Sequence, residues 1–164
     1  MQIRPERPGD VDAIRALTTA AFAGARYSSG TEAGIVDALR ADGMLTVSLV
    51  AEQDGEVIGH VAFSPVQIDT ADGDWFGLGP VSAAPAQQGQ GVGQALIRAG
   101  LRRLEATGAA GCVVLGDPGY YARFGFESDP ALRYGDAPAA YFQRLILKGP
   151  APSGQVRFQP AFEA

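Results

Sequence analysis

Apolar and polar positions along the chain follow two periods, one typical of helices and one typical of strands. Apolar residues recur every three or four positions in three segments, which predicts amphipathic helices at 11–22, 31–40 and 91–107. Asp10 and Gly108 stand where helix-capping residues are expected, before the first and after the third of these helices. Short apolar runs between turn residues predict strands at 2–4, 46–52, 57–68, 75–83, 112–115, 141–147 and 155–158, with a short helix at 118–124.

The order of these elements predicts the fold class. An antiparallel meander followed by a strand–helix–strand unit gives an α/β (α+β) domain, whose mixed, mostly antiparallel sheet carries helices on both faces. A chain of 164 residues is the size of one ordinary domain. The glycine- and proline-rich stretch 149–154 is the one break in composition. We therefore expect a domain at 1–148 and a tail at 149–164 with a short edge strand.

The segment Gln88-Gly89-Gln90-Gly91-Val92-Gly93 lies between the strand at 75–83 and the helix that follows it. Its three alternating glycines let the backbone turn tightly and leave backbone N–H groups uncovered. The first N–H groups of the helix have no acceptor within the helix, and the helix dipole is positive at this end. The segment therefore predicts a binding site for an anion, most simply a phosphate or pyrophosphate.

Two other phosphate-binding motifs do not fit this segment. The dinucleotide fingerprint G-x-G-x-x-G/A requires a small residue where Gln94 stands when counted from Gly89, and where Leu96 stands when counted from Gly91. A Walker loop requires Lys-Ser or Lys-Thr after its last glycine, and the chain has Gln94-Ala95 there. These mismatches disfavour a dinucleotide-binding or nucleotide-hydrolysing protein.

What does fit is the pattern Q-x-x-G-x-G from Gln88 to Gly93, which resembles the cofactor motif of the GNAT acyltransferase superfamily. A second motif about 30 residues later, Tyr121-Ala122-Arg123-Phe124-Gly125-Phe126, resembles the Y-x-x-x-G-F of the same family. The stretch 115–126 and the segments 33–39, 59–65 and 160–162 are similar to a bacterial subgroup of predicted N-acetyltransferases. The two motifs stand in the order expected for the family. The resemblance covers nearly the whole chain.

The resemblance implies a GNAT fold whose sheet splays between its fourth and fifth strands, with a bulge that Leu78-Gly79-Pro80 suits. It also implies acetyl-CoA as the cofactor and coenzyme A as a product. The pantetheine arm would contact the backbone of Val81 and Ala83. The residues implied to hold the pyrophosphate are Gln88, Gly89, Gln90, Gly91, Val92 and Gly93.

The reaction implied is direct transfer of an acetyl group to a primary amine in a ternary complex, with no covalent enzyme intermediate. By the family's pattern, Tyr121 protonates the departing thiolate, and we expect its neighbour Tyr120 to be a packing residue. The backbone near Val81 would polarise the thioester carbonyl. The alternative is a non-catalytic acyl-CoA-binding sensor or scaffold, against which Tyr121 argues because binding alone needs no proton donor.

The acceptor side is less defined by the sequence. Tyr27, Glu32 and His60 are the candidate acceptor-binding residues, and the general base is Glu32, His60 or water. The acceptor stays open between small amines, antibiotics, polyamines, lysine side chains and protein N-termini, and the sequence does not decide between a monomer and a homodimer.

Composition limits which classes of partner and which cellular compartment we expect. The net charge is −5 and the sequence has no block of like charges, which disfavours nucleic acid as a partner because such binders usually carry a basic face. The longest apolar runs are well short of the roughly 18 residues of a membrane span, and no signal peptide is evident. The single Cys112 excludes an internal disulfide and fits a small buried hydrophobe in a reducing compartment. We expect a cytoplasmic protein with no membrane contact and no metal site.

Overall fold

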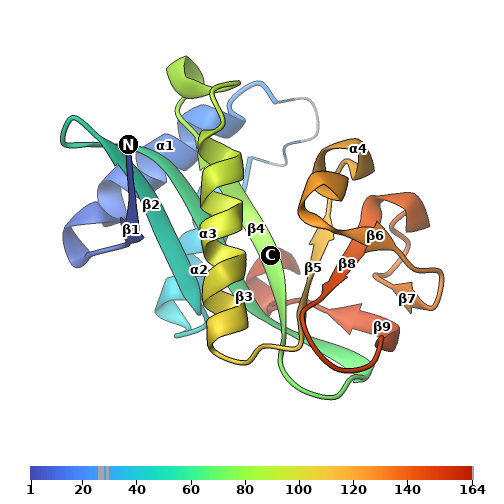
Figure 1. The fold of residues 1–164 in the computed structure, drawn as a ribbon. Helices are drawn as coiled ribbons and strands as arrows, with labels where there is room; N and C mark the ends of the chain where they lie inside the picture. The colour runs from blue at the N-terminus through green and yellow to red at the C-terminus, as the bar shows by residue number, and fades with distance from the viewer. Residues whose placement is uncertain (26–27, 29, 164) are drawn as a thin grey trace.

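The computed structural model describes residues 1–25, 28 and 30–163, and it shows one twisted sheet between two layers of helices (Figure 1). The helices are α1 (Val11–Phe22), α2 (Glu32–Ala41), α3 (Val92–Ala106) and the single turn α4 (Pro118–Tyr121). The strands are β1 (Gln2–Pro5), β2 (Val47–Gln53), β3 (Glu56–Thr70), β4 (Trp75–Ala83), β5 (Gly111–Leu115), β6 (Glu127–Ser128), β7 (Leu132–Arg133), β8 (Phe142–Ile146) and β9 (Ser153–Arg157). Within these described residues, no helix has the length and apolar character needed to cross a membrane.

The sheet confirms the predicted fold class. Its main path runs β1-β2-β3-β4-β5-β8-β6, and neighbouring strands on this path are antiparallel except for the parallel pair β4 and β5. The two long strands β3 and β4 form the centre. The elements predicted from periodicity are all present, whereas the two-residue strands β6 and β7 were not predicted.

The parallel pair β4 and β5 is short, and this is what opens the sheet. The strands are paired only where residues 75–77 face residues 111–113, and beyond that point they separate (Figure 1). On its other side β4 contains the predicted bulge, since the register with β3 shifts from Val61–Val81 to Phe63–Leu78 and leaves one extra residue in β4. The extra residue falls at Gly79-Pro80, where Gly79 has a φ of +135° and Pro80 has no N–H to donate.

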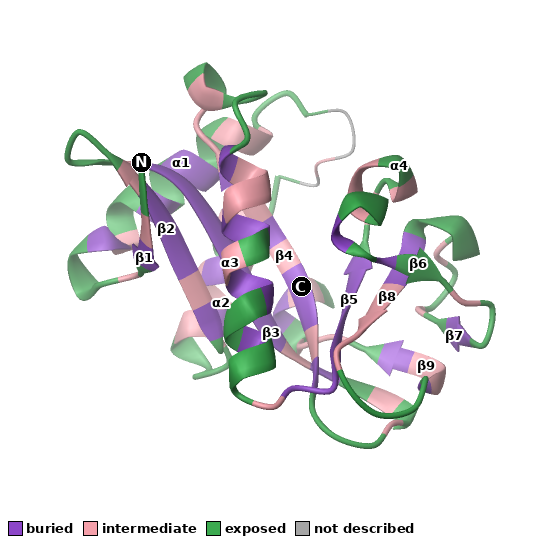
Figure 2. Ribbon diagram, in the orientation of Figure 1, coloured by how far each residue is buried: buried purple, intermediate pink, exposed green. Residues whose placement is uncertain are grey.

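Each face of the sheet is covered by helix, and the core lies on both faces (Figure 2). On one face α3 packs closely, because a side chain on Gly100 would overlap the buried ring of Phe63. On the other face, Ile14 of α1 and Val36 of α2 pack on Val50 of β2. This arrangement fixes the start of α3 beside β4, at the opening of the sheet.

Residues 149–163, within the segment expected to form a tail, pack against the rest of the domain. Strand β9 pairs with β7 and with residues 67–70 at the far end of β3. The 3-10 turn Pro160–Glu163 then contacts α2, and the ring of Phe162 meets that of Phe158 at a centroid distance of 5.2 Å. The segment thus connects the C-terminal end of β3 with helix α2.

Asp10 precedes α1 as predicted, but its carboxylate does not cap that helix. It accepts two hydrogen bonds from the buried Arg4 guanidinium, at 2.7 and 3.1 Å, and one from the Arg7 N–H at 2.6 Å. These bonds hold the pKa of Asp10 below its ordinary value, with the Arg4 hydrogen bonds as the largest cause. The residue therefore ties β1 to the start of α1.

Candidate active site

The connection from β4 to α3 has the geometry that its glycines predict. Gly89 and Gly91 have φ values of +81° and +82°, in the left-handed region that favours glycine. Gly91 is the N-cap of α3, and its carbonyl accepts the N–H of Ala95 at 3.0 Å. The first turn of α3 contains no acidic residue, so its N–H groups and the positive end of the helix dipole are available to an anion.

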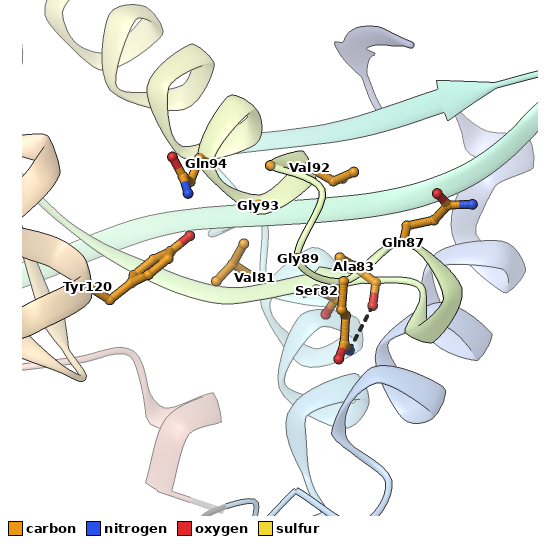
Figure 3. Close-up of a pocket in the computed structure, with 11 residues that line it drawn as sticks. Val81, Ser82, Ala83, Gln87, Gly89, Val92, Gly93, Gln94 and Tyr120 are labelled. Carbon is orange, nitrogen blue, oxygen red and sulfur yellow. Dashed lines mark hydrogen bonds between the residues drawn. The ribbon is translucent and has the colours of Figure 1, made fainter.

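This connection, β4 and α4 enclose a hollow of about 270 Å³ (Figure 3). Its walls are Val81, Ser82, Ala83, Gln87, Gln88, Gly89, Gly91, Val92, Gly93, Gln94 and Tyr120. The structure therefore brings together every residue that the resemblance implied for the cofactor except Gln90. The Gln90 side chain is exposed, and its amide donates to the Ala86 carbonyl at 3.3 Å on the outside of the loop.

Four residues of the wall were not predicted, namely Ser82, Gln87, Gln94 and Tyr120. Ser82 stands between the two β4 residues that were named, and Gln94 belongs to the first turn of α3, so both follow from a wider reading of the same motif. Neither Lys nor Arg is present among the described residues of this wall. An anion here would be held by backbone N–H groups, amide side chains and the helix dipole.

The backbone of β4 offers hydrogen-bond donors to the opening of the sheet. Ala84 donates its N–H to Ile58 of β3 at 2.8 Å, and the residues of β4 pair with β3 in an unbroken register from Val81 to Ala83. In an antiparallel pair, residues alternate between bonding the neighbouring strand and facing away from it. The N–H and C=O groups of Val81 and Ala83 therefore face the gap where β5 has separated, and the Gln88 amide reaches the Ala83 carbonyl there at 3.3 Å (Figure 3).

The two tyrosines of α4 occupy different places. The Tyr120 hydroxyl points toward the first turn of α3, and a Cβ added to Gly93 would lie 3.5 Å from its oxygen (Figure 3). The Tyr121 ring instead covers Gly116, where an added Cβ would lie 2.5 Å from a ring carbon, and it packs against Phe126. Tyr120 packs against the core as expected and also lines the hollow, while the Tyr121 ring takes the room that the missing side chain of Gly116 leaves.

Both hydroxyl groups are protonated at neutral pH. Burial raises the pKa of Tyr121 to about 12, and burial also raises the pKa of Tyr120, which the nearby Arg123 guanidinium partly offsets. The Arg123 guanidinium lies over the Tyr120 ring at 4.5 Å from its centroid. Either tyrosine can therefore donate a proton, and their positions distinguish their roles.

His60 is completely buried, so it cannot contact an acceptor directly as the sequence led us to expect. It lies in β3 opposite Ser82, and its Nε2 is 2.8 Å from the Ser48 hydroxyl. That hydroxyl donates to the carboxylate of Glu6, which in turn pairs with Arg40 at 2.8 Å. The Ser48 oxygen therefore accepts from His60, which assigns the ring hydrogen to Nε2 and leaves Nδ1 as an unpaired acceptor among the described residues.

The surroundings of His60 keep its ring neutral. Burial lowers its pKa to about 4, despite the opposing attraction of the nearby Glu6 carboxylate. The imidazole is thus part of a polar network between the sheet and the α1–α2 layer. In β3, the strand that pairs with β4, it lies opposite Ser82, which lines the hollow.

The remaining acceptor candidates lie at the start of α2. Glu32 is the first residue of that helix, and its carboxylate accepts a hydrogen bond of 2.6 Å from the Ser28 hydroxyl. Tyr27 lies outside the described residues. Among residues 1–25, 28 and 30–163, no cluster of three or more His, Cys, Asp or Glu side chains could hold a metal ion.

The hollow therefore suits a ligand with a diphosphate and an extended polar arm. Donors for the diphosphate converge at the start of α3, and a second set on β4 faces the gap beside it. The Tyr120 hydroxyl lines the hollow near Gly93, so a ligand there would meet a proton donor.

Comparison with known proteins gives a consistent family. Residues 45–128 match the family model described as an acetyltransferase (GNAT) domain. An Escherichia coli K12 protein, called the uncharacterized N-acetyltransferase YhbS, is 45% identical over 128 residues, which cover 77% of this chain and 74% of that protein.

Two solved structures are similar over almost their full length. A GNAT family acetyltransferase from Brucella melitensis, crystallised in complex with acetyl-CoA, is 53% identical with a TM-score of 0.87, covering 98% of this chain and 97% of the other. The Escherichia coli YhbS structure in complex with CoA is 38% identical with a TM-score of 0.90, covering 99% of this chain and 92% of the other.

Proposed function

Because the chain belongs to the GNAT acetyltransferase family, we propose that it transfers the acetyl group of acetyl-CoA to a primary amine by direct attack in a ternary complex. The observation that carries this proposal is the hollow at the start of α3, which joins anion-binding N–H groups to the gap-facing backbone of β4. Two similar structures, solved in complex with acetyl-CoA and with CoA, support the choice of ligand.

The cofactor site follows from the lining residues. Gly89, Gly91 and Gly93 allow a pyrophosphate to approach the backbone. The pantetheine arm of the cofactor would pass Gln88 on its way into the gap. When bound, acetyl-CoA supplies the acetyl group as an activated thioester. The N–H groups of Val81 and Ala83 face the gap, where they can donate to the pantetheine amides and to the thioester carbonyl oxygen.

We assign the proton donor to Tyr121. It is the residue that matches the family's Y-x-x-x-G-F motif, its ring adjoins the end of β5, and its raised pKa keeps the hydroxyl protonated at neutral pH. Tyr120 is assigned to cofactor binding, since its hydroxyl lines the hollow near Gly93. The amine nitrogen loses its proton to water or to Glu32, because the buried His60 does not reach the gap directly.

The test is an assay of free thiol released from acetyl-CoA across a panel of primary amines, together with calorimetry of acetyl-CoA binding. We expect binding and amine-dependent thiol release. Binding without thiol release with any amine would favour the non-catalytic sensor or scaffold. Failure of acetyl-CoA to bind at millimolar concentration, in a protein shown to be folded, would refute the proposed function altogether.

A further inference from the structure

A second hollow, of about 710 Å³, lies where β5 ends and the chain turns into α4. Its described walls include Leu115, Gly116, Asp117 and Tyr141. The Gly116 N–H donates to the Tyr141 carbonyl at 2.9 Å, so the two sides of this hollow are held together by the backbone. The wall is therefore built by regular structure, with side chains directed from the end of β5 and from the turn before β8.

Two of its side chains are unusual for their exposure. Leu115 is 47% exposed and Tyr141 is 49% exposed, and among the described residues only Met1 and Met44 are other large hydrophobic residues in this class. Exposing two large apolar side chains in one hollow leaves apolar surface that a ligand could cover. This feature indicates an apolar portion in the ligand.

Asp117 adds one negative charge to the same wall. One of its carboxylate oxygens accepts the Gly119 N–H at 2.9 Å, which makes it the N-cap of α4. Within the described part of the chain, no Lys, Arg or His side chain forms an ion pair with it. An exposed carboxylate without a partner cation, beside apolar walls, favours a ligand that carries a positive charge.

The hollow adjoins the proposed site of acetyl transfer. Asp117 immediately precedes the single turn of α4, whose Tyr120 lines the cofactor hollow. The Tyr121 ring packs beside Gly116, and β5 borders the gap into which β4 directs its N–H groups. Figure 1 shows α4 directly following the end of β5 at the open side of the sheet. The second hollow therefore lies at the turn into α4, whose Tyr120 lines the first hollow.

We propose that this hollow binds the acceptor, and that the acceptor is a primary amine carried on an aromatic or branched aliphatic body. The apolar body packs on Leu115 and Tyr141, and the carboxylate of Asp117 attracts the ammonium form. Amines that also carry a carboxylate are disfavoured by the same charge. This inference rests on the proposed function, since it names the substrate class of that site.

The chemical step balances for such an acceptor. The ammonium group first gives one proton to water, and the free amine then attacks the carbonyl carbon. A C–N bond forms as the C–S bond breaks, and the nitrogen gives its second proton to water. The sulfur leaves with the bonding electron pair and takes a proton from Tyr121, which is reprotonated from solvent. One ammonium ion and one acetyl thioester thus give one N-acetyl amine, one thiol and one proton.

The experiment measures binding and turnover of three matched amines by the protein saturated with CoA or acetyl-CoA. These are 2-phenylethylamine, ethylamine, which lacks the ring, and phenylalanine, which adds a carboxylate. We expect 2-phenylethylamine to bind about tenfold or more tightly than either of the others, in calorimetry with CoA and in KM with acetyl-CoA. Equal or tighter binding of ethylamine or phenylalanine would overturn the inference.

Three variants locate the site. Asp117→Asn keeps an oxygen for the Gly119 N–H and removes the charge, so the fold should survive while 2-phenylethylamine binds about tenfold less tightly. Leu115→Ala and Tyr141→Ala should each weaken binding by a similar factor of about ten. The matched controls are Asp72→Asn, in the turn before β4, and Met44→Ala, neither of which should change the affinity.

The outcomes separate this inference from the function on which it rests. Unchanged 2-phenylethylamine affinity in all three folded variants would overturn the inference, even if the amine is acetylated. If the unsubstituted protein does not bind acetyl-CoA, that result would instead contradict the proposed function. An intact acetyl-CoA affinity in Asp117→Asn, together with its weakened amine binding, would support the assignment of the second hollow to the acceptor alone.

Discussion

Replacing Gly91 by Asp tests the cofactor site most directly. Gly91 has a φ of +82°, so any L-residue there is strained by about 1–2 kcal/mol. A Cβ at this position meets nothing within 4 Å, so the added side chain begins in open space. For a chain of this size, we expect the melting temperature without ligand to fall by about 2–8 °C, with the fold retained.

The effect on acetyl-CoA should be much larger than the effect on the fold. The added carboxylate stands at the N-cap of α3, where the pyrophosphate is proposed to approach. Two like charges about 4 Å apart at an effective dielectric constant of about 20 repel by about 4 kcal/mol. Salt screens part of this repulsion, so we expect the dissociation constant to rise by about 10²–10³-fold.

Two further variants separate strain from charge. Gly43→Asp introduces the same side chain at a similar φ of +71°, also with nothing within 4 Å, but after α2 and away from the hollow. It should lose stability without losing affinity. Gly91→Asn adds nearly the same volume without charge. The difference in acetyl-CoA affinity between Gly91→Asn and Gly91→Asp therefore gives the electrostatic part of the effect. The measurements are calorimetry and thermal unfolding with and without acetyl-CoA, and an unchanged affinity in folded Gly91→Asp would refute the assignment of this loop.

Four other substitutions and one control test the site and the packing around it. Tyr121→Phe should lower kcat by about 10²–10⁴-fold with little change in acetyl-CoA affinity, while Tyr120→Phe should mainly weaken that affinity; the reverse result in steady-state kinetics and calorimetry would exchange their roles. Gly100→Ala should lower the free energy of unfolding by about 1–3 kcal/mol in urea titrations because its methyl group overlaps a ring of β3, whereas Gly34→Ala, which meets nothing within 4 Å, should not. His60 has its pKa lowered from 6.5 to about 4, so between these values the unfolded chain binds a proton that the folded chain does not, and stability falls as the pH falls. His60→Gln should reduce the stability loss between about pH 7 and about pH 4.5 by up to about 3 kcal/mol, and an unchanged pH slope would contradict this assignment.

The sequence predicted the helices and the longer strands because each follows from local rules, and the family resemblance implied the bulge. Periodicity identifies α3, and the proline and glycine at 79–80 mark where the β4 ladder is interrupted. The two-residue strands β6 and β7 carry too few residues to show a period. The pairing of β9 with the far end of β3 joins segments more than 80 residues apart, which no local pattern reveals.

The features of the site that the sequence did not show depend on the packing of side chains. The sequence of a short turn such as α4 does not show which of two adjacent tyrosines lines a hollow, and in this structure the Tyr121 ring fills the space beside Gly116. The burial of His60 depends on the strands and helices that cover both faces of β3. The apolar residues around His60 in the sequence fit a half-exposed strand as well as a buried one. The sequence could therefore indicate His60 as a candidate but not show that it is buried.

The two hollows differ in how their specificity is encoded. The cofactor hollow presents backbone N–H groups, and the glycines that expose these groups form a motif with fixed spacing, so the amino-acid sequence alone is enough to recognise it. The second hollow presents side chains from the end of β5, the turn into α4 and the residue before β8, which come together only when the sheet forms. A backbone hydrogen bond between Gly116 and Tyr141 holds the wall of the second hollow together. Its side chains can therefore change without disturbing the backbone geometry at α3. One framework can thus keep a single acyl donor while its acceptor changes, and for this reason the acceptor has to be inferred from Leu115, Asp117 and Tyr141 and not from the family motifs.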